Sequence, residues 1–293
     1  MRSLRTNKTL RTNVITYAVV VAAFVLFQAL GSAGVLSSTM KGQLVPICAY
    51  VLMALSLNLT VGILGELSLG HAGFMSVGAF AGAVTASAMQ DSVPSSALRL
   101  TVAVLVGAAL AAIVGVLIGI PVLRLNGDYL AIVTLAFGEI IKSIVNNLYI
   151  GMDVNGLHAS FLNNTIVLGE GGRMILSGPM GVPGIKKTAT FAAGFILILI
   201  ALFVIFNLVN SRAGRAIMAL RDNRIAAESV GINVTKYKLM AFVISAAIAG
   251  AGGALYGQAQ NAIIATKFDF NTSILILVFV VLGGLGNMLG SIV

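Results

Sequence analysis

The sequence predicts an all-α, polytopic helical membrane protein with about eight spans, broken or re-entrant segments and a cytoplasmic N-terminus. Composition is the first reason, because 58% of the 293 residues are apolar and only 9% are charged, whereas a soluble domain has about 25% charged residues. The second reason is that long, continuous apolar runs recur along the chain, and a membrane-spanning helix needs about 20 such residues. A large soluble catalytic domain is therefore excluded.

The expected spans follow a short basic segment, residues 1–13, which is predicted to lie in the cytoplasm. The first apolar run, 14–36, is longer than the ~7–15 residues of a signal-peptide core, so we interpret it as an uncleaved anchor. Residues 14–293 then form a single transmembrane domain. Further spans are expected at 44–64, 66–89, 98–123, 129–149, 189–210, 238–262 and 271–293.

The distribution of basic residues sets the predicted orientation. If the chain alternates sides from an inside N-terminus, the inside segments hold 11 of the 18 Lys and Arg residues. This orientation places loop 211–238 inside and the long loop 150–188 outside.

Two glycine-rich stretches interrupt the apolar pattern, GILGELSLGHAG at 62–73 and GGLGNMLG at 283–290. Glycine clusters mixed with polar residues are typical of broken membrane segments that are buried in protein and flank a substrate path. Close helix packing at small-xxx-small faces is the alternative, and pairs such as Gly78 and Gly82 or Gly253 and Gly257 favour it elsewhere. The uncharged stretch after Asp269 predicts a truncated C-terminus.

Loop 211–238 is polar and predicts two short helices. The first spans 212–221, and the second begins at a capping Asp222 or Asn223 and ends at Gly231 after about two turns. This helix could be a plug for a groove on a partner protein or a connector lying on the membrane surface. The residues that would form the plug are Asn223, Arg224, Ala226, Ala227, Glu228 and Gly231.

Four further polar residues are candidates for a pathway or a structural role. Glu139 and Lys142 lie inside an expected span, and their i,i+3 spacing allows an ion pair that either fixes packing or serves a pathway. Ser68 and His71 lie in the first broken segment, where we expect a hydrogen-bonded structural histidine. No catalytic residue and no metal site are predicted, since the two histidines are far apart and the one cysteine lies in an apolar run.

The inside loop also carries a recognisable pattern, Asn223-x-x-Ala226-Ala227-x-x-x-Gly231-Ile232-Asn233, followed by Lys238-x-x-Ala241-Phe242. It resembles the coupling-helix signature of ABC importer permeases, and more narrowly the M-type (LivM-like) permeases of branched-chain amino-acid importers. Stretches 58–80, 124–141 and 280–293 also resemble that family, in the same order. Loop 150–188 departs from it.

The resemblance implies a permease domain at 14–293 rather than an enzyme, located in a bacterial inner membrane as a multi-pass protein. It implies a sister permease subunit, two cytoplasmic ATPase subunits and a periplasmic binding protein as partners, with no role for nucleic acid. No cofactor is expected in this chain, because ATP would bind to the partner subunits and the sequence has no GxxxxGK[ST] phosphate loop. The expected cargo is leucine, isoleucine and valine. One alternative keeps the architecture and changes the cargo to urea or short amides. Two others change the class of protein, to an ion-coupled transporter using Glu139 and His71 or to a purely structural subunit.

Overall fold

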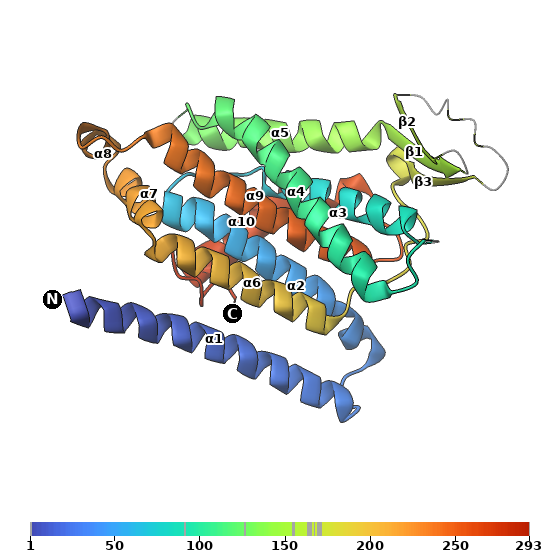
Figure 1. Ribbon diagram of the computed structural model, residues 1–293, viewed down its shortest axis with the longest axis horizontal. Coiled ribbons are helices and arrows are strands. Elements are labelled where there is room, and N and C mark those ends of the chain that lie inside the picture. Colours follow the sequence, from blue (N-terminus) through green and yellow to red (C-terminus); the bar gives the residue numbers. More distant parts are fainter. Residues whose placement is uncertain are drawn as a thin grey trace.

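The computed structural model describes residues 2–90, 92–125, 127–153, 156–162, 166, 168 and 172–292, and it shows a bundle of long helices with a different small element at each end. At one end lie two short helices, α7 (Arg212–Asp222) and α8 (Arg224–Ser229). At the other end lies a small sheet of β1 (Leu148–Asp153), β2 (Gly156–Phe161) and β3 (Arg173–Ser177). The N-terminus lies at the α7–α8 end (Figure 1), as the predicted alternation of sides requires.

The long helices account for the predicted spans. They are α1 (Arg2–Ser32), α2 (Ser38–Asn58), α3 (His71–Ala88), α4 (Ser96–Val122), α5 (Asp128–Asn146), α6 (Phe191–Asn210), α9 (Val234–Ala259) and α10 (Phe270–Gly283). Within the described residues, seven helical stretches are long and apolar enough to cross a membrane. The predicted span at 66–89 is not among them, because its helix α3, although 18 residues long, contains His71 and several glycine, serine and threonine residues and is too weakly apolar.

Close packing of small residues holds α3, α4 and α9 together in the centre of the bundle. A Cβ added to Gly253 would collide with the backbone at Met75, and one added to Gly78 would collide with the backbone of Gly250. One added to Gly82 would lie 2.8 Å from the Cβ of Ala254. The predicted small-xxx-small packing is therefore confirmed, since any side chain at these glycines would force the helices apart.

Both predicted breaks are present. Helix α2 continues as a π-helix, η1 (Leu59–Leu64), which ends at Gly65 with a left-handed φ of 81°, and regular structure resumes at His71. Helix α10 ends at Gly283, after which the chain folds back in turns. The two breaks lie against each other, because the Asn58 side-chain oxygen accepts a hydrogen bond of 2.7 Å from the backbone N–H of Gly286.

The small sheet departs from the all-α expectation. Its order is β2-β1-β3 with antiparallel neighbours, and it occupies part of the stretch expected as an irregular loop, 150–188. The strands have only five or six residues each and stand in a Gly- and Asn-rich stretch, so their period-two pattern is short and weak. Two short 3-10 helices, η2 (Gly178–Met180) and η3 (Ala265–Lys267), complete the regular structure of the described residues.

Candidate functional site

Helix α8 forms as the sequence predicts, although it is shorter. The side-chain oxygen of Asn223 accepts a hydrogen bond of 3.0 Å from the backbone N–H of Ala226, so Asn223 rather than Asp222 is the cap. Gly231 has a left-handed φ of 85°, and its N–H donates to the carbonyl of Glu228 at 2.9 Å. The six-residue helix is therefore held at both ends by its own sequence.

The outward face of α8 differs from the predicted alanine pair. Ala227 is only 4% exposed and packs with Leu220 and Val234 of its own chain, while Ala226 is exposed. The large apolar side chains that point outward are Ile225, 80% exposed, and Val230, 76% exposed. Sequence reasoning missed these two, although an isoleucine and a valine in a charged loop could have indicated them.

The predicted rim residues Arg224 and Glu228 make polar contact with each other. Their side chains form an i,i+4 ion pair of 4.0 Å on the surface of α8. Such an exposed pair stabilises a helix by a few tenths of a kcal/mol, about 0.3–0.5 kcal/mol. It therefore leaves the two apolar side chains as the distinctive feature of this surface.

The first broken segment holds a buried polar cluster. His71 Nδ1 lies 3.1 Å from Ser68 Oγ, and His71 Nε2 lies 2.8 Å from Ser245 Oγ on α9. Thr60 Oγ1 donates to the same Ser245 Oγ at 2.8 Å, and Ser245 Oγ donates to the backbone oxygen of Ser56 at 2.7 Å. All five residues are buried. His71 is hydrogen-bonded as predicted, and the cluster joins α2, η1, the break and α9.

Two contacts tie this broken segment to the loop that carries α7 and α8. Glu66 forms an ion pair with Lys238 in the first turns of α9, and the two side chains are only 12% and 5% exposed. Arg221, near the end of α7, donates from Nη1 to the carbonyl of Gly62 at 3.0 Å. Sequence reasoning did not assign Glu66 a role, because its partner lies 172 positions away and no local pattern joins them.

The Glu139–Lys142 pair lies elsewhere, on α5. The Lys142 ammonium is 2.8 Å from a Glu139 carboxylate oxygen, which confirms the predicted i,i+3 ion pair. The Glu139 side chain is 44% exposed midway along the helix. A charge at that depth is costly against lipid, about 2.5–3.5 kcal/mol on insertion scales. This face of α5 therefore suits contact with water or with another protein.

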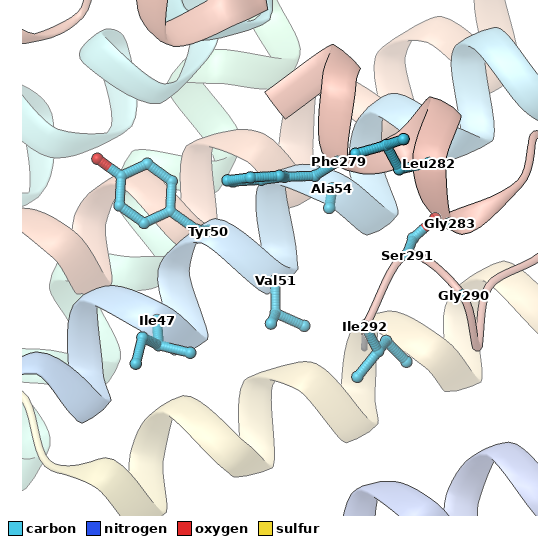
Figure 2. Close-up of a pocket in the computed structure, with 10 residues that line it drawn as sticks. All are labelled: Ile47, Tyr50, Val51, Ala54, Phe279, Leu282, Gly283, Gly290, Ser291 and Ile292. Atoms are coloured by element: carbon cyan, nitrogen blue, oxygen red, sulfur yellow. The ribbon is translucent and has the colours of Figure 1, made fainter. Parts of the chain in front are cut away.

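A cavity lies between α2, α10 and the chain that follows α10 (Figure 2). Its volume is about 670 Å³, and it is lined by Ile47, Tyr50, Val51, Ala54, Phe279, Leu282, Gly283, Gly290, Ser291 and Ile292. None of these side chains is charged, so the cavity suits an apolar group and offers no ionic partner for the amino and carboxyl groups of a free amino acid.

The comparison with known families then identifies the chain. Residues 39–293 match the family described as the permease component of the branched-chain amino acid transport system. The chain belongs to this permease family. With its seven long apolar stretches, this permease is a multi-pass membrane protein. The family match confirms the resemblance drawn from loop 211–238 and the three accompanying stretches.

Individual relatives agree with the family. The permease is 38% identical to the high-affinity branched-chain amino acid transport system permease protein LivM of Salmonella typhimurium, over 81% of this chain and 57% of the relative. It is 36% identical to LivM of Escherichia coli over the same shares, and 25% identical to the nucleoside ABC transporter permease protein NupC of Lactococcus lactis over 67% of this chain and 59% of that protein. The chain thus spans a little over half the length of these relatives. No solved structure matches it.

Proposed function

We propose that this chain is a permease subunit of an ATP-driven importer in a bacterial inner membrane, which carries leucine, isoleucine and valine delivered by a periplasmic binding protein. The observation that carries the proposal is helix α8, a capped helix that presents Ile225 and Val230 outward and packs through Ala227 against Leu220 of α7 and Val234 of α9. Exposed apolar side chains on a short rigid element are what a groove on a partner protein would take up.

In this function the chain is one half of a channel. A sister permease subunit supplies the other half, and two cytoplasmic ATPase subunits bind ATP and hydrolyse it. Helix α8 docks on one ATPase subunit, and closure of the two ATPases rocks the spans between outward-facing and inward-facing states. The permease itself performs no chemistry and needs no cofactor. Its role is to convert a movement at α8 into opening and closing of a path.

The cargo is supported by the names of the relatives in the family, and the mostly apolar lining of the α2–α10 cavity would suit the apolar side chains of these amino acids. Relatives with lower identity carry other cargo in their names, a nucleoside in Lactococcus lactis and fructose in Bifidobacterium longum. Urea and short amides remain cargo alternatives within the same architecture, so the test must include more than one compound.

The test is uptake into proteoliposomes that hold the whole complex, with ATP inside and the binding protein outside. Labelled leucine, urea and a nucleoside are supplied in parallel, with and without an imposed ion gradient. We expect ATP-dependent leucine uptake. Uptake of urea or of a nucleoside alone would support the ATP-driven importer but change its cargo. Uptake driven by the ion gradient without ATP would contradict the ABC assignment and direct attention to Glu139.

A further inference from the structure

The broken segment between α2 and α3 is attached both to the loop carrying α7 and α8 and to the membrane core. A role beside a substrate path does not require this double attachment. The segment is attached to the loop by the Glu66–Lys238 ion pair and by the Arg221 bond to the Gly62 carbonyl. On its other side it is attached to the membrane core through the His71 cluster. We call the first set of contacts, Glu66, Lys238, Arg221 and the Gly62 carbonyl, the clamp.

The clamp contacts are close and specific. Gly65 stands in the left-handed region, with φ 81°, and a Cβ there would lie 2.5 Å from the Cγ of Arg221, so the arginine stem lies directly over the glycine. Lys238 could extend toward water, as lysine does at membrane edges, yet it is buried against Glu66 instead. We call loop 211–238 the coupling loop. Its residues Arg221 and Lys238 both contact the break, and neither contact reaches the body of α2.

The attachment to the core is equally direct. Downstream of Glu66, the backbone N–H of Leu69 donates to Thr134 Oγ1 of α5 at 3.0 Å, and Ser68 contacts His71. His71 in turn contacts Ser245 on α9, the helix that carries Lys238 near its start. A displacement of α7 and the start of α9 is therefore linked through the broken segment to the junction of α3, α5 and α9, and the part of this link around Ser68, His71 and Ser245 is buried.

We propose that the clamp makes the broken segment move with the coupling loop, so that Glu66 and Lys238 are positioning residues which transmit the movement of α8 into the membrane core. This rests on the proposed function, because the movement starts from an ATPase docked on α8. A buried ion pair that loses one partner leaves an uncompensated charge. The expected consequence is a segment that no longer follows the loop, which uncouples ATP hydrolysis from transport.

The first test uses the reconstituted complex and compares leucine uptake with ATP hydrolysis. Glu66→Gln and Lys238→Met should each lower uptake about 10-fold more than hydrolysis, within the usual range of a coupling free energy between two sites. The swapped pair, Glu66→Lys with Lys238→Glu, should recover part of the loss. Lys236→Met is the matched control, because Lys236 also lies in the first turns of α9 but its side chain is exposed.

The results separate the two proposals. If the native complex shows no ATP-dependent uptake, the proposed function fails. If the native complex transports but both single variants keep its ratio of uptake to hydrolysis, the inference is wrong. The same conclusion holds if the variants lower both rates by the same factor and the swapped pair recovers nothing, because the clamp would then be only structural.

A second measurement leaves the clamp intact, so it decides the question even if the variants do not assemble. Spin labels are placed in a Cys48→Ala background at Leu67→Cys with Ser229→Cys, and in a second sample at Ile47→Cys with Ser229→Cys. On adding a non-hydrolysable ATP analogue to the complex, the Ile47 to Ser229 distance should shift while the Leu67 to Ser229 distance stays the same. An equal shift in both pairs, or a shift in neither, would overturn the inference.

Discussion

Two glutamate–lysine ion pairs of the same chemistry occur among the described residues, and they differ in what they hold together. Glu139 and Lys142 lie one turn apart on α5, so their contact joins two residues of a single helix. Glu66 and Lys238 are 172 positions apart and buried, so their contact fixes a broken segment against the start of α9. The difference teaches that the distance a pair spans along the chain, together with its burial, decides whether the pair has architectural consequences.

The largest expected effect is on the long-range pair. Glu66→Gln or Lys238→Met should destabilise the detergent-solubilised protein by about 3–5 kcal/mol, because each leaves a buried charge without its partner. The double variant should cost less than the sum, since both charges are then gone. Denaturant titration of the two single variants, the double variant and the native protein measures the cycle. Additive losses in the double variant would show that the two side chains act independently.

The next effect concerns binding of the ATPase subunit to α8, where the movement transmitted by the clamp begins. Ile225→Glu should leave the stability of the isolated permease unchanged, because the side chain is 80% exposed, and should weaken binding of the ATPase subunit roughly 30-fold, as for an apolar anchor worth about 2 kcal/mol. Leu157→Glu, an exposed leucine at the sheet end, is the control and should not change binding. A binding titration with the purified ATPase subunit decides it.

Ala227→Glu is a less selective test of the same surface. Ala227 is buried against its own chain, so a charge there disrupts the packing of α8 as well as any docking. Native-like ATPase affinity for Ile225→Glu would contradict the assignment of α8 as the docking helix, whereas loss of affinity in Ala227→Glu alone would have two explanations.

The third effect tests the contact between the two breaks, at Gly62 and Gly286. Gly62→Ala should destabilise the protein by about 1–3 kcal/mol, because its Cβ would collide with the side chain of Asn58 and the backbone of Gly286. The same substitution at Gly42 in α2 meets open space and should stabilise by about 0.4–1 kcal/mol. Thermal unfolding of the two variants compares them directly. Equal midpoints would show that the two breaks do not press on each other.

The sequence predicts the local features of this fold well, and the reason is physical. Apolar runs of fixed length, glycine clusters and capping side chains act within one turn or one segment, so most spans, both breaks and a cap at Asp222 or Asn223 can be predicted from neighbouring residues alone. The Glu139–Lys142 pair belongs to the same class, because helical geometry alone brings i and i+3 together.

The features that the sequence does not predict depend on how distant segments cross. Glu66 meets Lys238, and Asn58 meets Gly286, only because α2, α9 and α10 converge at one end of the bundle. The outward face of α8 is likewise set by tertiary packing, which buries Ala227 and leaves Ile225 exposed. The small sheet was missed because strands this short in a glycine-rich stretch carry little period-two pattern.

The smallest expected stability change is at the local pair, and there transport is the informative measurement. Glu139→Gln should change the unfolding free energy by no more than about 0.5 kcal/mol, since an i,i+3 pair contributes little to a helix. It should nevertheless lower leucine uptake several-fold, because a half-exposed carboxylate midway along a membrane helix is retained against its insertion cost only where it faces water or protein. Glu139→Asp keeps the charge and should retain most of the uptake. Native uptake in Glu139→Gln would instead assign the pair to the packing of α5, and both glutamate–lysine pairs would then be structural, differing only in the distance over which they act.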